Sequence, residues 1–388
     1  MKIAIDARPL VTRRISGAEQ RARSIVGEWS RLQLPHEFLL LYVEPDDAAD
    51  FDDSLITALP ANFRPFPLAS YDFPPRFHFG SRLLNALSRA LHRSKADVYH
   101  SFTPLVPRTS SCALVPTIHD LSFELDPLMR QDVQSRIMRR RLRRAIAYAD
   151  RIITVSSQTK YDVAAIYRID PSRIDVVYNG IDPEFSPHDG PPERYPVLVE
   201  HDITGPYVLS VGADIPRRNY TRLLAAMQRV WQGGLNVRWV LAGRSDWKIT
   251  DIYHAAREAN VLQHIRFVTS PTSTQLVQLY RGATITCCAS SFEGFGLSVL
   301  ESMACGIPVS CSDMRSLREV AGEAAVYFAH DDPESMSQAI AGLLEDAEYR
   351  RQLKYRGLRR VERFRWRRAA ELILETLNTV AATRVNPS

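Results

Sequence analysis

The chain has 388 residues, of which 45% are hydrophobic and 24% charged, and its formal net charge is +5. This length exceeds what one hydrophobic core supports, so two domains are expected, and the modest charge gives no reason to expect a nucleic-acid partner. The sequence contains no run of eighteen apolar residues, so no membrane-spanning helix is predicted. Five cysteines without a Cys-x-x-Cys pair, and an opening strand pattern in place of a signal peptide, favour a cytoplasmic protein with reduced thiols.

The first 190 residues alternate strand and helix patterns, which is typical of a parallel α/β domain. Helices are expected at residues 18–32 and 131–149. The segments expected to form strands are residues 3–7, 38–43, 98–101, 113–118, 152–155 and 174–178. An acidic loop at residues 44–53 is most simply a solvated surface. An aromatic, proline-rich loop at residues 71–79 either contacts an acceptor or lipid or packs as an irregular loop.

Gly17 and His119 each lie in a loop beside a predicted strand, where ligands gather in open α/β sheets. The first loop, residues 8–17, lacks Gly-x-Gly-x-x-Gly, so the dinucleotide fingerprint is absent. Gly17 is therefore either a plain turn glycine or a residue that lets the loop approach a ligand. His119 is either a structural histidine or a residue that faces a ligand cleft.

The helix expected at residues 131–149 is basic and amphipathic. Its apolar stripe consists of Val133, Ile137, Leu142, Ala145, Ile146 and Ala149. Its arginines lie mostly off that stripe, and they are Arg136, Arg139, Arg140, Arg143 and Arg144. Such a helix either presents a solvated basic face or lies against anionic lipid, where each arginine contributes about 1 kcal/mol.

A proline-rich stretch at residues 183–192 marks a domain boundary, which we place between residues 190 and 191. The second domain, residues 191–365, has the same alternation of strands and helices. Its expected strands are residues 207–212, 237–243, 265–269, 283–289, 308–312 and 325–328. Arg217, Arg218 and Arg244 follow the first two of these strands. Their planar guanidinium groups suit phosphate oxygens, although arginine pairs are usually surface charge.

The strongest motif follows the strand at residues 283–289. Glu293 stands in a glycine-containing loop, and Glu301 stands about two turns into the next helix. The first helical amides have no intrahelical acceptor and carry partial positive charge, so a phosphate can bind there. Because Gly294 and Gly296 lack a β-carbon, a polyhydroxylated ligand can reach the amides between them. For an isolated pair of glutamates, a helix cap and a solvated helix residue are the alternatives.

Seven residues separate the two glutamates, Gly-Phe-Gly follows the first, and Gly306-Ile307-Pro308-Val309 closes the helix. This pattern resembles the Glu-x7-Glu motif of the retaining GT-B glycosyltransferases of family 4, which include mannosyltransferases of bacterial surface polysaccharides. The resemblance covers nearly the whole chain. It implies the α/β GT-B fold, in which two Rossmann-like domains face each other across a cleft and the last helix, residues 366–388, crosses back to the first domain.

The resemblance implies transfer of a hexose from a nucleotide-diphosphate sugar to a hydroxyl, with retention at the anomeric carbon. Arginines and helix amides would stabilise the leaving diphosphate in place of a metal. The sequence has no Asp-x-Asp in a plausible loop and no His/Cys cluster, so no bound cation is expected. His119 and Glu293 are the predicted catalytic residues, as groups that position the donor sugar.

The resemblance also assigns the remaining contacts. The residues expected at the donor diphosphate are Arg217, Arg218, Arg244, Leu297 and Ser298. Those expected at the donor sugar are Gly294, Phe295 and Gly296, those at the nucleoside are Glu301, Thr269, Ser270 and Thr272, and Gly17 lies in the loop that approaches the donor or the acceptor. In one departure from the usual pattern of the family, Arg218 occupies a lysine position.

The opening Ile5-Asp6-Ala7-Arg8-Pro9-Leu10 looks most like that of the mannosyltransferases, so GDP-mannose is the expected donor and a UDP-hexose the alternative. The expected acceptor is a glycan or lipid-linked glycan of polysaccharide or lipopolysaccharide biosynthesis, at the inner face of the plasma membrane. Two other classes remain. A nicotinamide-dependent oxidoreductase would need the missing glycine fingerprint, and a catalytically inert GT-B partner protein would not need both glutamates, His119 and Arg217.

Overall fold

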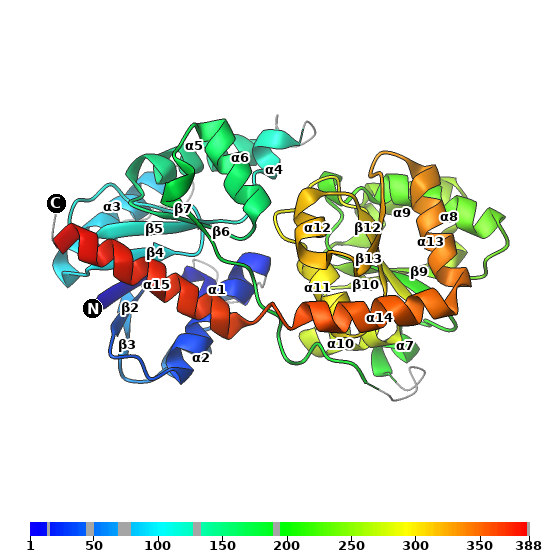
Figure 1. Ribbon diagram of the computed structural model, residues 1–388, viewed down its shortest axis with the longest axis horizontal. Helices are drawn as coiled ribbons and strands as arrows, with labels where there is room; N and C mark the ends of the chain where they lie inside the picture. Colours follow the sequence, from blue (N-terminus) through cyan, green and yellow to red (C-terminus); the bar gives the residue numbers. More distant parts are fainter. Residues whose placement is uncertain (14–15, 44–49, 69–78, 127–132, 189–194, 386–388) are drawn as a thin grey trace. The chain divides into compact units, whose positions relative to one another are not determined.

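The computed structural model describes all residues except 14–15, 44–49, 69–78, 127–132, 189–194 and 386–388. The acidic loop therefore lies partly outside the described residues, as does the predicted boundary at 190/191, and the aromatic loop lies almost wholly outside them. The chain forms two compact units (Figure 1). Unit 1 contains residues Met1–Glu124, Gln131–Gly180 and Arg365–Ser388, and unit 2 contains Leu125–Arg130 and Ile181–Phe364.

Unit 1 is built on a seven-stranded parallel sheet with the order β3-β2-β1-β4-β5-β6-β7. Its strands are β1 (Lys2–Asp6), β2 (Glu37–Tyr42), β3 (Phe63–Pro67), β4 (Val98–Ser101), β5 (Ala113–Ile118), β6 (Ile152–Thr154) and β7 (Ile174–Val176). The central strands β4 and β5 are buried along their whole length. Continuous burial of this kind is expected where helices cover both faces of a parallel sheet.

The first α-helix of unit 1 is α1, and its N-terminus carries a capping box formed by Ser16 and Glu19. The helices are η1 (Arg8–Leu10), α1 (Gly17–Arg31), α2 (Ser54–Thr57), α3 (Phe79–Ser94), α4 (Ser122–Leu125), α5 (Val133–Tyr148), α6 (Ser157–Tyr167), η4 (Pro171–Arg173) and α15 (Trp366–Val385). On α5 the predicted apolar stripe divides. Leu142 and Ala145 are buried, whereas Val133 is 62% exposed and Ile137 41% exposed, so only the C-terminal part of the stripe is buried.

The last helix, α15, packs in unit 1 with the first residues of the chain. The Trp29 Nε1–H group of α1 donates a hydrogen bond of 3.0 Å to the carbonyl of Ala370. Ile373 and Leu377 belong to the same buried cluster as Ile3 of β1. Figure 1 shows α15 in red beside the blue N-terminal elements.

The chain passes from unit 1 to unit 2 at Gly180 and returns after Phe364. The Ile181 amide donates to the Phe364 carbonyl at 3.2 Å, so the two passages lie side by side. A β-carbon on Gly180 would overlap the backbone nitrogen of Trp366, which restricts this position to glycine.

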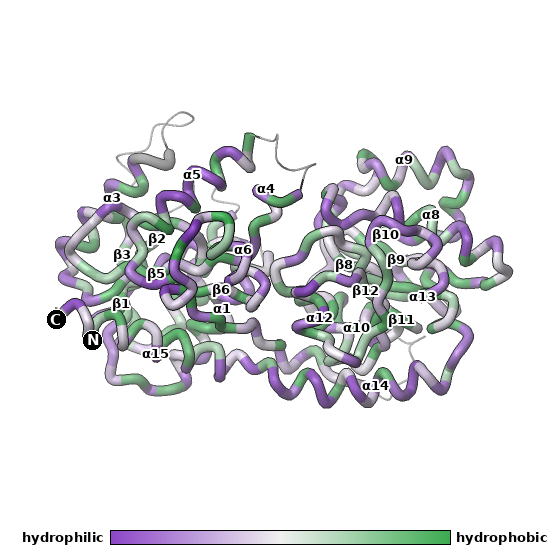
Figure 2. Tube along the Cα trace, turned by 45° about the horizontal axis from the view of Figure 1, so that its top comes forward, coloured by the Kyte–Doolittle hydropathy of each residue, from purple (hydrophilic) through white to green (hydrophobic). Residues whose placement is uncertain are grey.

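Unit 2 holds a six-stranded parallel sheet with the order β10-β9-β8-β11-β12-β13. Its strands are β8 (Tyr207–Val211), β9 (Arg238–Gly243), β10 (Ile265–Thr269), β11 (Ile285–Cys288), β12 (Val309–Ser312) and β13 (Ala325–Phe328). Its helices are α7 (Pro196–Glu200), η6 (Pro216–Arg218), α8 (Tyr220–Gln232), η7 (Trp247–Ile249), α9 (Asp251–Glu258), η8 (Leu262–His264), α10 (Ser273–Gly282), α11 (Leu297–Ala304), α12 (Arg315–Ala321), α13 (Pro333–Glu345) and α14 (Ala347–Val361). Figure 2 shows α14 alternating between purple and green, as expected for a helix with one apolar face, and it packs on α11.

The strand order reverses direction once in each sheet, between β1 and β4 in unit 1 and between β8 and β11 in unit 2. Ligands of open α/β sheets bind outside the carboxyl ends of the strands at such switch points. The predicted α/β fold with two parallel sheets is confirmed, and each unit offers one switch point for a site.

Candidate functional site

In unit 2 the loops that follow β8 and β11 meet at the switch point. The Asn219 side-chain amide ties them together by donating to the Ala289 carbonyl at 3.1 Å, and the Ser291 amide donates to the Arg217 carbonyl at 2.8 Å. Gly212, at φ +140°, makes room for the Arg218 guanidinium, because a β-carbon there would lie 2.6 Å from Arg218 Nε. The sequence between Gly212 and Asn219 thus fixes both arginines against the second loop.

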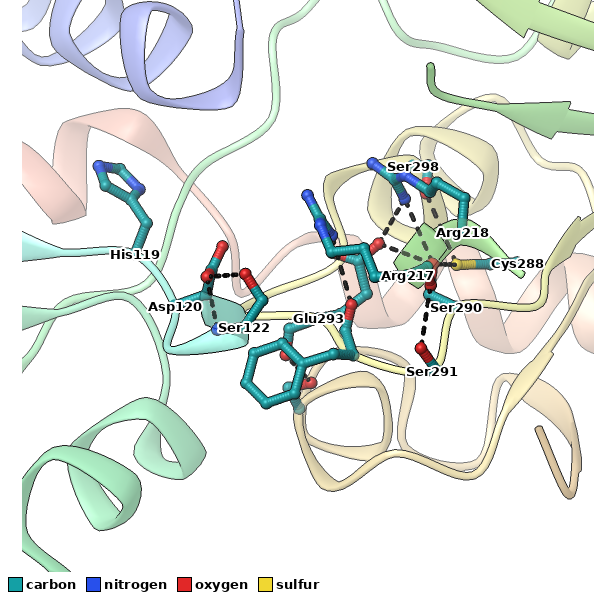
Figure 3. Close-up of polar contacts among 12 residues, drawn as sticks. His119, Asp120, Ser122, Arg217, Arg218, Cys288, Ser290, Ser291, Glu293 and Ser298 are labelled. Carbon is teal, nitrogen blue, oxygen red and sulfur yellow. Dashed lines mark hydrogen bonds and ion pairs between the residues drawn. The ribbon is translucent and has the colours of Figure 1, made fainter. Parts of the chain in front are cut away.

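Glu293 is the centre of this site (Figure 3). Its Oε1 atom accepts hydrogen bonds from Arg218 Nη1 and from the Ser290 hydroxyl, the latter at 3.0 Å. Its Oε2 atom accepts from Arg217 Nη1 at 3.2 Å. The Ser316 hydroxyl donates to the Glu293 carbonyl at 2.6 Å, which fixes the backbone as well.

Burial by itself raises the pKa of the Glu293 carboxyl, but the cations of Arg218 and Arg217 outweigh burial, and the pKa lies below 4.5. Glu293 is therefore ionised near neutral pH, and it orients two guanidinium groups in a largely buried setting. Arg217 and Arg218 side chains are 17% and 18% exposed, so they stay reachable for an anion. Guanidinium groups held in this way suit the oxygens of a phosphate.

The N-terminus of α11 lies directly after Glu293. Gly296 precedes the helix with φ +98°, a left-handed conformation that favours glycine. The amides of Leu297 and Ser298 have no protein acceptor among the described residues, so they remain free for an anion. Phe295, predicted at the donor sugar, has a buried ring that packs edge-on against Phe364 at 5.8 Å. The ring of Phe295 is therefore taken up by packing.

Glu301 lies further along α11 and is also buried. Its Oε2 atom accepts a hydrogen bond of 2.8 Å from the hydroxyl of Tyr280 on α10. Burial raises the pKa of Glu301 to about 7, and the Tyr280 hydrogen bond and the cation of Arg218 offset only part of that rise. This carboxyl is therefore partly protonated near neutral pH, unlike Glu293.

The other residues predicted in unit 2 lie outside this cluster. Arg244 is exposed and makes no contact with Glu293 or its two arginines. Thr269 donates to the Ser245 carbonyl at 3.4 Å, and Ser270 has φ +47° and donates its amide to Gly243 at 2.8 Å. The Thr272 hydroxyl caps α10 by accepting from the Gln275 amide at 3.2 Å. The Thr272 side chain is therefore occupied by a structural role.

In unit 1, His119 follows β5 and its Nε2 atom lies 2.7 Å from the Phe102 carbonyl. A carbonyl only accepts, so Nε2 carries the proton and Nδ1 is an acceptor. Burial, followed by the cation of Arg21, lowers the pKa of His119, which keeps the ring neutral near pH 7. Figure 3 also shows Asp120 accepting from Ser122 beside it. Gly17 is the first residue of α1, directly after the capping Ser16.

Ser290, Ser316 and Tyr280 are site residues that the sequence analysis missed. Ser290 stands three positions before Glu293, and that spacing within the loop was a usable signal. Ser316 and Tyr280 belong to other helices, and nothing in their local sequence distinguishes them from packing residues.

Among the described residues, no group of three or more His, Cys, Asp or Glu side chains could hold a metal ion. No described helix is long and apolar enough to cross a membrane.

Comparison with known proteins gives matches over both units. Residues 199–360 match the model of the glycosyl transferases group 1, and residues 15–185 match that of glycosyltransferase family 4. Over 279 residues the chain is 29% identical to O-antigen chain mannosyltransferase B of Escherichia coli, covering 71% of this chain and 73% of that relative.

Solved structures share the fold. Sucrose-phosphate synthase from Thermosynechococcus elongatus superposes with a TM-score of 0.78 at 19% identity, covering 99% of this chain and 100% of the other. Anabaena HepE in complex with UDP-glucose gives a TM-score of 0.74 at 16% identity, covering 98% and 100%.

Proposed function

Because the chain belongs to glycosyltransferase family 4, we propose that it transfers mannose from GDP-mannose to a hydroxyl of a glycan or lipid-linked glycan, with retention at the anomeric carbon. The Escherichia coli relative is an O-antigen mannosyltransferase, which supports this donor and a place in polysaccharide biosynthesis. HepE, whose solved complex contains UDP-glucose, keeps a UDP-hexose as the alternative.

The observation that carries the proposal is the cluster of Arg217, Arg218 and Glu293 beside the free amides of Leu297 and Ser298. Departure of a nucleoside diphosphate develops negative charge on its phosphate oxygens. Two oriented guanidinium groups and two helix amides stabilise that charge without reorganisation during the reaction. The leaving phosphate then accepts the proton of the attacking hydroxyl.

Three further residues are proposed around the donor. Glu301 accepts hydrogen bonds from the ribose hydroxyls through its Oε1 atom, since Tyr280 donates to Oε2. Glu293 positions the donor sugar and holds the arginines. His119 offers Nδ1 as an acceptor to a sugar hydroxyl, a role that fits its neutral ring and its Nε2 contact with Phe102.

We also propose peripheral contact of α5 with anionic lipid, which would bring a lipid-linked acceptor to the enzyme. Its support is the pair of exposed apolar side chains, Val133 and Ile137, beside the exposed Arg140 and Arg143. Apolar residues flanked by arginines are typical of helices that lie in the membrane interface.

Turnover of the Glu293→Gln variant tests the proposed role of Glu293. The amide keeps an acceptor for Ser290 but no longer balances the two arginines, so we expect kcat for GDP release from GDP-mannose to fall about 10²-fold or more. We expect the affinity for GDP to stay within about threefold, because the arginines and helix amides remain. The matched control is Glu258→Gln on the exposed end of α9, which should behave as wild type. Unchanged turnover of Glu293→Gln would contradict the role.

A panel of donors separates the remaining alternatives. Release of UDP from UDP-glucose, with none of GDP from GDP-mannose, would select the UDP-hexose. Release from no nucleotide sugar, with or without acceptor, would favour the inert partner protein.

A further inference from the structure

The proposed function gives no role to Tyr280, the residue that contacts Glu301. The Tyr280 hydroxyl, on α10, donates to Glu301 Oε2 at 2.8 Å, and Oε1 has no hydrogen-bond partner among the described residues. Tyr280 is completely buried, whereas Glu301 is 6% exposed. Of this pair, only Glu301 is therefore open to a ligand, and Oε1 is the atom with hydrogen-bonding capacity left.

The Tyr280 side chain is held in place by packing. Its ring contacts Phe185 edge-on, with 5.8 Å between the ring centroids. The next residue, Arg281, donates from Nε to the Ser186 carbonyl at 2.8 Å, which fastens the same segment of chain to α10. Because the phenol is fixed in this way, its hydroxyl holds the carboxyl of Glu301 in one orientation.

The bond between the two side chains joins a neutral donor to a buried carboxyl. Burial, followed by the charge of Glu301, raises the pKa of the Tyr280 hydroxyl well above its usual range, so the hydroxyl keeps its proton. A neutral donor offsets only part of the free energy needed to bury a carboxylate. Glu293, in contrast, has two guanidinium partners. Glu301 has no ion-pair partner in the part of the chain that the structure describes.

Other charged and titratable groups near Glu301 do not replace a counter-ion. The cation of Arg218, in the loop after β8, favours the ionised form, but it is already bound to another carboxylate. Asp182, which follows the passage from unit 1, disfavours the ionised form. The thiol of Cys305, one turn further along α11, has its pKa raised to about 12 by burial and stays neutral. Helix α14 packs on α11 and brings Lys354 beside the C-terminal end of that helix.

We infer that Tyr280 positions Glu301 for the donor, so that the ribose hydroxyls bind at Oε1 and the proton of Glu301 leaves to solvent as they bind. The inference rests on the proposed function, because the ribose is part of the donor nucleotide. A carboxylate accepts at both oxygens, whereas a carboxylic acid loses acceptor capacity on the oxygen that carries the proton. Since Tyr280 donates to Oε2, the proton of the neutral form lies on Oε1. On binding, this O–H bond breaks, its proton goes to the buffer, and the ribose hydroxyls donate in its place.

Proton release is measured by calorimetry of the full chain at pH 7, in buffers that differ in their enthalpy of ionisation. GDP-mannose is the probe, because neither of its phosphates titrates near neutral pH, and UDP-glucose replaces it if UDP-glucose is the sugar nucleotide that binds. We expect release of about half a proton for each molecule bound, because a pKa of about 7 leaves about half of the Glu301 carboxyls protonated. The affinity should rise about tenfold between pH 6 and pH 8. Both effects should vanish in Glu301→Gln.

Two tyrosine variants separate positioning from packing. Tyr280→Phe keeps the ring but removes the donor to Oε2, so the pKa of Glu301 rises, and we expect the midpoint of the pH dependence to move upward by about one pH unit. The preference for GDP over 2′,3′-dideoxy-GDP should also fall. The matched control is Tyr207→Phe, which removes a buried hydroxyl that donates to the Leu279 carbonyl of the same helix at 2.5 Å. It should keep the wild-type midpoint.

A tyrosine that only packs would lower the affinity in Tyr280→Phe without moving the midpoint. That result, or binding of the sugar nucleotide to wild type without proton release, would overturn the inference and leave the donor site of unit 2 in place. The wild-type measurement needs no variant, so it decides the question even if Tyr280→Phe does not fold. Binding of no sugar nucleotide would instead overturn the proposed function, and the inference with it.

Discussion

Glu293 and Glu301 are separated by seven residues and both are buried, yet the pKa values of their carboxyl groups shift in opposite directions. Two guanidinium groups contact Glu293, whereas Glu301 receives a neutral hydroxyl from Tyr280. The environment therefore gives one motif two different carboxyl groups. One is ionised near neutral pH and holds cations, and the other changes its charge near neutral pH.

The raised pKa of Glu301 predicts how stability depends on pH. Below pH 4.5 the carboxyl is protonated in both the folded and the unfolded chain. Between pH 4.5 and about 7 the unfolded chain ionises first, so stability is lost as pH rises. We expect Glu301→Gln, which keeps an acceptor for Tyr280, to be more stable than wild type at pH 8 by roughly 3 kcal/mol, because the pKa rises from 4.5 to about 7 and each pKa unit corresponds to about 1.4 kcal/mol.

Urea unfolding at pH 8 and at pH 4 measures this difference. The gain from Glu301→Gln should shrink toward zero at pH 4, and the exposed Glu258→Gln should show a small, equal effect at both pH values. A gain of the same size at both pH values would contradict the raised pKa of Glu301.

The two glutamates, the glycines between them and the arginines of the first loop could be named from the sequence, because their spacing is local. Tyr280 could not, since it lies on a different helix and its sequence context is that of an apolar core position. The choice between Arg217 and Arg218 was also beyond the sequence, and the structure brings both to Glu293.

The short helix α11 depends on the glycine that precedes it. A β-carbon on Gly296 would overlap Leu317 Cδ2, and φ +98° is unfavourable for any other residue. We expect Gly296→Ala to destabilise unit 2 by about 1–3 kcal/mol and to weaken nucleotide binding, because the amides of α11 move. The control is Gly342→Ala in α13, where open space predicts a neutral or slightly stabilising effect in urea unfolding. Equal stability of the two variants would contradict this account of α11.

The basic helix α5 gives a prediction about lipid. Arg139 forms an ion pair with Glu124 at 3.6 Å. The exposed Arg140 and Arg143 are therefore the better positions for a reversal of charge. We expect Arg140→Glu/Arg143→Glu to reduce binding to phosphatidylglycerol vesicles by tenfold or more, at about 1 kcal/mol for each arginine lost and with repulsion added.

Co-sedimentation with the vesicles measures this binding. The matched control is Arg351→Glu/Arg356→Glu on α14, which makes the same change in net charge on unit 2. Equal loss in the two double variants would show that binding follows net charge and not α5.

Strand β3 is an element that the sequence did not predict. Its sequence, Phe-Arg-Pro-Phe-Pro, contains two prolines and was not predicted as a strand. It lies at the edge of its sheet, where a proline can be tolerated because the outer side needs no ladder partner. The sequence also did not predict that only part of the apolar stripe of α5 is buried. The period of 3.6 residues identifies the apolar face of a helix, but it does not say which residues of that face other elements cover.

Across the whole molecule, the parallel alternation of strands and helices predicted both sheets, because β-α repetition is a strong local pattern. The passage between units was placed at 190/191 from the proline-rich composition, whereas the chain leaves unit 1 at Gly180. Composition marks an irregular segment, but the passage is fixed by the close approach of Gly180 to Trp366, which are distant in the sequence.

The most direct test of the account is calorimetric titration of the full chain with GDP, UDP and ADP and with their hexose conjugates. The cluster of Arg217, Arg218 and Glu293 predicts that one nucleotide family binds at a single site, and GDP and GDP-mannose are the expected pair. Binding should weaken about tenfold or more in Arg217→Gln, through loss of a charge-assisted hydrogen bond to phosphate. Failure of every nucleotide to bind wild type would contradict a nucleotide-sugar site in unit 2.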